Sequence, residues 1–126
     1  MTFLRKFKFE QLIVWQKAVD LSELVHQVTK KFPKDEIYVL SSQMKRAADS
    51  VSLNIAEGST GQSNAEFKRF LGIALRSAIE VVGCLFLAKR RGFIFPAIFD
   101  DIYKRCSEIV AMINSLRNSL TKRNIN

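Results

Sequence analysis

Apolar residues recur at alternating intervals of four and three along most of the chain, and this spacing constrains the fold more than any other sequence feature. Side chains at these intervals lie on one face of an α-helix. The pattern is interrupted at three places, and proline or glycine stands at each of them. With only five glycines and two prolines, the chain has too few breakers for the many turns of an all-β domain. The sequence therefore predicts four amphipathic helices, over about residues 11–31, 35–57, 64–91 and 96–120.

Each predicted helix has its own stripe of inward-facing side chains. In chain order, the four stripes contain Val14, Ala18, Leu21, Val25, Val28 and Phe32; Ile37, Leu40, Met44, Ala47, Val51 and Asn54; Phe67, Leu71, Ala74, Ala78, Val81, Leu85 and Ala88; and Phe99, Ile102, Cys106, Ile109, Ile113, Leu116 and Leu120. Helices joined by short connections bury such stripes by running up and down around a shared core. The expected fold class is all-α, an antiparallel up-and-down four-helix bundle in a single domain over residues 1–126.

Apolar residues also lie beside the stripes of the last three predicted helices. One wide apolar stripe is ordinary in a bundle, but several indicate a surface that contacts another subunit. These additional residues include Leu53, Phe70, Ile73, Phe86, Ile98 and Tyr103. We therefore expect the bundle to assemble as a homo-oligomer.

Local signals mark the ends of the predicted helices. Pro33 ends the first helix, because proline disfavours the helical conformation in the residue before it. Gly58 and Gly92 are predicted to cap the second and third helices, since glycine takes the left-handed conformation without steric cost. Ser63 and Glu66 match a capping box at the start of the third helix.

The chain is strongly basic, with 20 Lys and Arg against 12 Asp and Glu, a formal charge of +8 and a pI near 9.8. Such a surplus favours polyanionic partners through counterion release, although it also serves ordinary solubility. The basic start of the chain lacks the apolar run of a secretory signal, so we expect a cytoplasmic protein without a membrane partner. Cys84 and Cys106 are predicted to be small buried hydrophobes, since two cysteines make no disulfide framework.

The sequence offers little for catalysis. His26 is the only histidine, and Val25 rather than His26 falls on the inward stripe, so a bundle-type di-iron site or a histidine-activated nucleophile is not expected. Gly58 to Gly61 is too short for a phosphate-binding loop and lacks its lysine. We therefore predict no catalytic residue, no cofactor and no metal site.

A polar cluster on the second and third predicted helices is the most informative group of polar residues. Asn54 falls on the stripe, where a buried amide weakens packing but can fix register and partner choice. Because buried charges must be paired, its charged members are predicted to form charge-assisted bonds near or between subunits. A carboxylate active site and direct contact with a ligand or RNA are the alternatives. The cluster consists of Gln43, Arg46, Asn54, Glu57, Ser77 and Glu80.

In an up-and-down bundle the first and third helices end at the same pole. Six cations therefore come together there, and we call them the basic pole: Lys30, Lys31, Lys34, Lys89, Arg90 and Arg91. This set is the candidate phosphate-binding surface. The alternative is a solvated cap of cations that complements the negative ends of the helix dipoles. Phe93 and Phe95 stand beside the set, where they would either stack on bases or plug the core.

Five motifs occur in order along nearly the whole chain. They are 12–18 (Leu-Ile-Val-Trp-Gln-Lys-Ala), Phe32-Pro33, 43–51 (Gln-Met-Lys-Arg-Ala-Ala-Asp-Ser-Val), 54–58 (Asn-Ile-Ala-Glu-Gly) and 66–74, which begins Glu-Phe and ends Ile-Ala. Together they resemble the four-helix proteins encoded in 23S rRNA intervening sequences. The chain departs from that pattern at Gly61-Gln62, where the family tends to have Arg, and at Arg76, where it tends to have Gly.

The resemblance implies a homopentamer with a basic surface and no established activity. A related group, similar in fold, is the accessory protein of diversity-generating retroelements, which works beside a reverse transcriptase and its RNA. We expect a non-enzymatic homo-oligomer that binds structured RNA or other nucleic acid through phosphates, with little base specificity. The alternative is an interaction scaffold or adaptor for an acidic protein partner, such as nucleic-acid-processing machinery.

Overall fold

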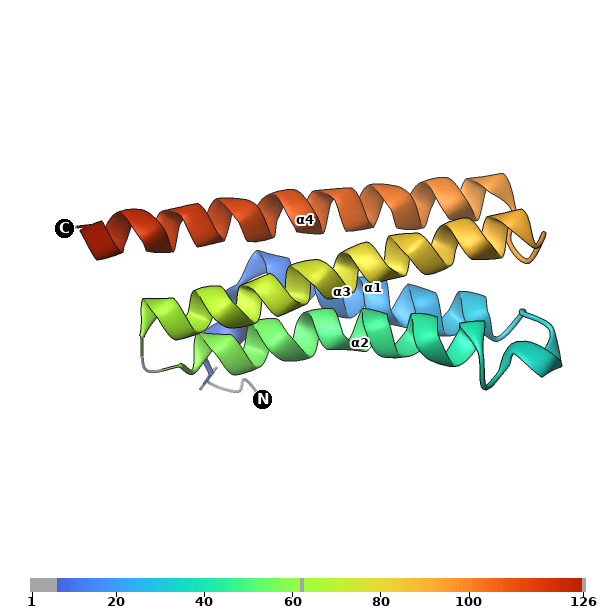
Figure 1. Ribbon diagram of the computed structural model, residues 1–126, viewed down its shortest axis with the longest axis horizontal. Helices are drawn as coiled ribbons and strands as arrows, with labels where there is room; N and C mark the ends of the chain where they lie inside the picture. Colours follow the sequence, from blue (N-terminus) through green and yellow to red (C-terminus); the bar gives the residue numbers. More distant parts are fainter. Residues whose placement is uncertain (1–6, 62, 126) are drawn as a thin grey trace, which may run out of the picture.

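The four apolar stripes meet in one hydrophobic core. The computed structural model describes residues 7–61 and 63–125, with side chains up to Thr121. Its long helices are α1 (Ile13–Thr29), α2 (Leu40–Ser59), α3 (Asn64–Arg90) and α4 (Pro96–Ile125), and two short 3-10 helices, η1 (Lys8–Gln11) and η2 (Lys34–Glu36), precede α1 and α2. No strand occurs in the described ranges, so the predicted all-helical class with four long helices is confirmed. The chain reverses direction at each connection, so that the long helices lie side by side (Figure 1).

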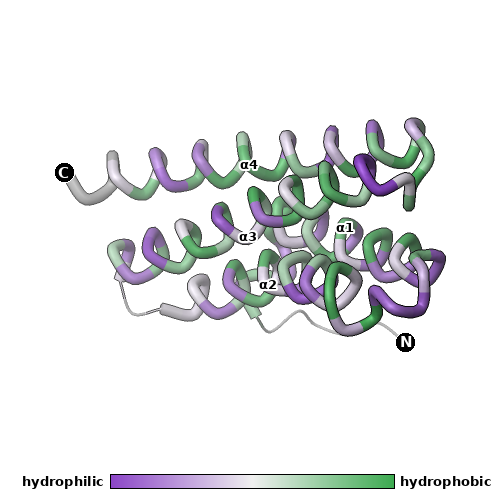
Figure 2. Tube along the Cα trace, turned by 45° about the vertical axis from the view of Figure 1, so that its right-hand side comes forward, coloured by the Kyte–Doolittle hydropathy of each residue, from purple (hydrophilic) through white to green (hydrophobic). Residues whose placement is uncertain are grey.

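The stripe of α3 is buried along its whole length, from Phe67 to Ala88. α3 packs against α2 and α4 and makes its most extensive contact with α2, whereas α1 packs against α2 and, less extensively, against α4. Small side chains are buried on both α2 and α3, among them Ala47 on α2 and Ala74 and Ala78 on α3. Figure 2 shows apolar and polar residues alternating along every long helix, as expected when each turns one face to the core.

The predicted start of α2 was wrong. The helix begins at Leu40 instead of residue 35, and Ile37 is 47% exposed, not on the inward stripe. η2 occupies Lys34–Glu36, and Val39 has φ −120° and ψ −101°, outside the helical region. Isoleucine, tyrosine and valine are weak helix formers, so nothing local carries the helix through residues 37–39.

Two further details of α2 differ from the prediction. Ile55 is fully buried where Asn54 was expected on the stripe, and Asn54 is only partly buried. Gly58 does not cap the helix, because α2 continues to Ser59. Gly58 packs against α3, where an added Cβ would lie 2.5 Å from Cβ of Phe70. The glycine therefore permits close packing of the two helices.

By length and composition alone, α3 is apolar enough to cross a membrane, a test that the core helix of a soluble protein also passes. The last helix is longer than predicted, because α4 continues to Ile125 instead of ending at about residue 120, and α1 is two residues shorter at each end. The capping signals that precede and follow α3 agree with the structure. The hydroxyl of Ser63 accepts a bond from the amide of Glu66 at 3.1 Å, as a helix cap should. Gly92 has φ +75° at the end of α3, and Pro96 is the first residue of α4.

Candidate nucleic-acid interface

The structure brings the six residues of the basic pole to one end of the molecule. α1 and α3 both end there, and η2 lies between the end of α1 and the start of α2 (Figure 1). All six side chains are exposed. Because the carbonyl ends of α1 and α3 point to this pole, the negative ends of their dipoles favour cations there.

Two of the six cations have a partner. Nη1 of Arg91 lies 3.8 Å from Oε1 of Glu36, and Nζ of Lys89 stands 4.4 Å from the ring centroid of Phe99. Within residues 7–61 and 63–121, no ion pair engages Lys30, Lys31, Lys34 or Arg90. These four exposed charges therefore remain available to an anion.

The two aromatic residues of the turn before α4 differ in role. Phe93 is half-buried, and its ring centroid lies 5.4 Å from that of Phe32. Phe95 is 79% exposed. Phe93 thus closes the core at the basic pole, while the ring of Phe95 faces solvent.

Four of the six residues of the polar cluster line one groove between α2 and α3, with a volume of about 540 Å³. Nε2 of Gln43 donates to Oε2 of Glu80 at 3.3 Å across the groove. Deeper down, the hydroxyl of Ser77 donates to the hydroxyl of Ser50 at 2.8 Å, and Asn54 donates to that same oxygen at 2.9 Å. Ser50, which the sequence did not single out, is thus the acceptor that joins the two helices.

Glu80 accepts the bond from Gln43, but no ion pair joins the charged members of the cluster in the described residues. Arg46 lines the groove but makes no ion pair with Glu57 or Glu80 in the described residues. Both Arg46 and Glu57 are exposed, so neither needs a partner inside the chain. Any pairing of these charges belongs to contacts with another molecule.

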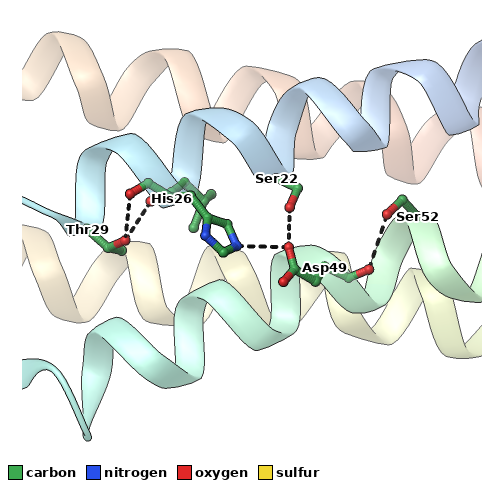
Figure 3. A network of polar contacts seen from close by, with 6 residues as sticks. Ser22, His26, Thr29, Asp49 and Ser52 are labelled. Carbon is green, nitrogen blue, oxygen red and sulfur yellow. Dashed lines mark hydrogen bonds and ion pairs between the residues drawn. The ribbon is translucent and has the colours of Figure 1, made fainter.

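A second polar network, which the sequence reading did not detect, connects α1 to α2 (Figure 3). Oδ1 of Asp49 accepts a hydrogen bond from the hydroxyl of Ser22 and lies 3.0 Å from Nε2 of His26. A histidine that activates a serine must contact the hydroxyl itself, but here the carboxylate oxygen stands between them. Ser22 and His26 are four residues apart on one helix, which is the only signal the sequence carried for this contact.

Both cysteines are buried, as expected. Burial raises the pKa of the Cys106 thiol to about 12. Burial, and to a lesser degree the charge of Glu80, raises the pKa of the Cys84 thiol. Since the thiolate is the reactive form, neither side chain is prepared for nucleophilic chemistry at neutral pH.

Comparison with known proteins connects this geometry to a family. Residues 10–115 match the family model of the 23S rRNA-intervening sequence protein. A solved structure, described as a protein with unknown function from the S23 ribosomal protein family of Bacteroides thetaiotaomicron VPI-5482, is similar with a TM-score of 0.78 and 27% identity. The similarity covers 83% of this chain and 98% of that chain. Comparison with curated proteins gives no match.

The family model extends from η1 into α4, so it includes α1, α2, α3 and the first 20 residues of α4. It therefore covers both residue sets described above, the basic pole and the groove between α2 and α3. The chain belongs to the family of 23S rRNA-intervening sequence proteins.

Proposed function

We propose that this chain is a non-enzymatic cytoplasmic protein whose basic pole binds structured RNA through phosphates, with little base specificity. The observation that carries the proposal is the group of four exposed cations, Lys30, Lys31, Lys34 and Arg90, without an ion pair in the described residues. The formal charge of +8 and a family named after a 23S rRNA intervening sequence support it.

The proposal includes an assembly of antiparallel bundles, pentameric as the family resemblance implies. Exposed apolar side chains on α3 and α4 support self-association, among them Phe86, Leu87 and Tyr103. Several basic poles on one particle would bind a folded RNA at several places and raise its overall affinity. Such a particle would also suit a role beside a reverse transcriptase and its RNA, the role expected if the sequence resemblance extends to retroelement accessory proteins.

A filter-binding assay with a labelled hairpin RNA tests the basic pole. We expect binding that weakens steeply between 50 and 200 mM salt, because phosphate contacts release counterions. Replacing Lys89, Arg90 and Arg91 by Ala should lower affinity for every RNA tested and reduce the salt dependence by about one unit of slope per lost contact. Replacing Lys30, Lys31 and Lys34 by Ala should act in the same way.

The matched control removes three charges elsewhere, by replacing Lys17, Lys104 and Arg105 with Ala. These residues lie along α1 and α4, outside the basic pole, so this variant should retain most of the affinity. No retention of RNA by the wild-type protein at low salt would refute the proposal. An equal loss in the control variant would show that net charge, and not the pole, binds RNA.

A groove between α1 and α4 favours a second candidate function, a scaffold for an acidic protein partner. The groove has a volume of about 480 Å³ and is mostly apolar, with Leu24, Val28 and Ile98 among its residues. Lys31 lies at its edge, so an amphipathic segment with acidic residues would complement it. Co-purification of a defined acidic protein that survives nuclease treatment and is lost in Lys31→Glu would favour this function over RNA binding.

A further inference from the structure

A second concentration of positive charge lies between α3 and α4, in the half of the molecule away from the basic pole. A groove of about 450 Å³ opens there beside the start of α3 and the end of α4. Among the described residues, its lining contains four cations and no acidic side chain. We call it the Arg117 groove and define it by Lys68, Arg69, Gly72, Arg76 and Arg117.

Arg117 is positioned as a donor without an acceptor. Its Nε atom is buried and has no hydrogen-bond partner among the described residues. Its guanidinium lies over Gly72, since a Cβ on that glycine would be 3.6 Å from Nη2. Leaving a guanidinium N–H unpaired away from water is unfavourable, so the groove gains stability from an oxygen acceptor.

The remaining cations surround the same glycine. Lys68 and Arg76 stand one turn before and one turn after Gly72, on the same face of α3. Arg69 is partly neutralised, because Nη2 lies 3.3 Å from Oε1 of Glu66. Within the described residues no ion pair engages Lys68, Arg76 or Arg117. Three like charges therefore converge on one groove without a counter-charge from the chain.

We propose that the Arg117 groove binds a phosphate group. Arg76 and Arg117 supply planar guanidinium groups that match two phosphate oxygens, and Lys68 adds a point charge. The phosphate belongs either to an RNA backbone or to a free oligophosphate. This site uses none of the residues of the basic pole, so it goes beyond the function proposed above.

Calorimetric titration with pyrophosphate tests the site with a pair of matched variants. Gly72→Asp places a carboxylate beneath Arg117 and should reduce pyrophosphate affinity at least tenfold. Gly83→Asp makes the same change on the same helix, where an added Cβ meets nothing within 4 Å, and should bind like the wild type. Arg76→Gln should also weaken pyrophosphate binding, although it leaves Gly72 and Arg117 unchanged.

The hairpin RNA assay identifies the source of the phosphate. A loss of RNA retention in Gly72→Asp, but not in Gly83→Asp, would show that the groove holds an RNA phosphate. Unchanged retention together with lost pyrophosphate binding would show that it holds a free oligophosphate.

Two results would overturn the proposal. One is equal pyrophosphate affinity in Gly72→Asp and Gly83→Asp. The other is a wild-type protein that binds no pyrophosphate, together with RNA retention that is the same in the wild type and in Gly72→Asp. The variant lacking Lys89, Arg90 and Arg91 separates the two proposals, because it should lose RNA at the basic pole and keep its affinity for pyrophosphate.

Discussion

Gly58 determines how closely α2 approaches α3. An added Cβ would lie 2.5 Å from Cβ of Phe70 and 3.1 Å from Cδ1 of Phe67, which is nearer than packed carbon atoms can stand. The Cβ atom of Phe70 is fixed to the backbone of α3 and cannot rotate away. Any side chain at position 58 must therefore push the two helices apart.

Gly58→Ala should lower the free energy of unfolding by about 1–3 kcal/mol, the usual cost of overpacking a core. Gly83→Ala is the control, since its Cβ meets nothing within 4 Å. That change should raise the free energy of unfolding by about 0.5–1 kcal/mol, because alanine favours the helix. Urea unfolding measures both, and a stabilising Gly58→Ala would contradict the role given to this glycine.

Individual residues were predictable where the spacing leaves one choice. All seven predicted residues of the α3 stripe are buried, because the four-three spacing continues from Phe67 to Ala88 without a polar residue in the stripe. After Val51 the spacing allowed either Asn54 or Ile55, and the buried residue is Ile55, since isoleucine needs no hydrogen-bond partner. The contact between His26 and Asp49 depends on the register between α1 and α2. The apolar spacing within a single helix does not predict that register.

At the scale of the element, the end of α3 is a Schellman motif. The amide of Phe93 donates to the carbonyl of Ala88 at 2.9 Å, and the amide of Gly92 donates to Lys89 at 3.1 Å. Gly92 has φ +75°, a conformation that costs other residues free energy. This cap directs the chain back toward α4 at the basic pole.

Gly92→Ala should therefore lower the free energy of unfolding by about 1–2 kcal/mol, the cost of the left-handed conformation for a residue with a Cβ atom. Gly92→Asn should cost less, because asparagine tolerates that conformation. Thermal or urea unfolding of the two variants checks the order. An equally stable Gly92→Ala would mean that the turn has another accessible conformation.

The start of α2 shows which element boundaries a sequence leaves open. Ile37 has the spacing of the stripe that begins with Leu40, although it lies before the helix. Periodicity alone therefore predicted a start of α2 that is five residues too early. The weak helix propensity of residues 37–39 favours the later start. Just before them, Glu36 in η2 reaches Arg91 at the end of α3. That contact joins distant parts of the chain, and local propensity cannot predict it.

At the scale of the whole molecule, the apolar surface of α3 and α4 predicts self-association. Phe86 is 52% exposed and Tyr103 is 44% exposed, and their ring centroids are 6.3 Å apart. Phe86→Lys should shift the mass measured by light scattering from an oligomer toward the monomer of 14.4 kDa. Phe95→Lys, at an exposed residue beside the basic pole, should leave the mass unchanged. A wild-type protein with the mass of one chain would exclude the assembly.

The candidate sites were only partly predictable from the sequence. The basic pole followed from helix count and direction, because alternating helices must end together. The Arg117 groove requires α3 and α4 in their actual register, which brings Arg117 over Gly72 although 45 residues separate them in the sequence. Arg76 was noted only as a departure from the family pattern, and the structure places it in this groove.

The length of α3 has a consequence for any polyanion that meets both cation sets. Lys68 and Arg90 lie on this one rigid helix, separated by about 33 Å at the usual rise per residue. If phosphates bind both at the basic pole and in the Arg117 groove, a ligand shorter than this spacing would contact only one of the two sites at a time. A longer ligand would gain its second contact at a high effective concentration. The bundle would then select polyanions by their reach and not by their bases.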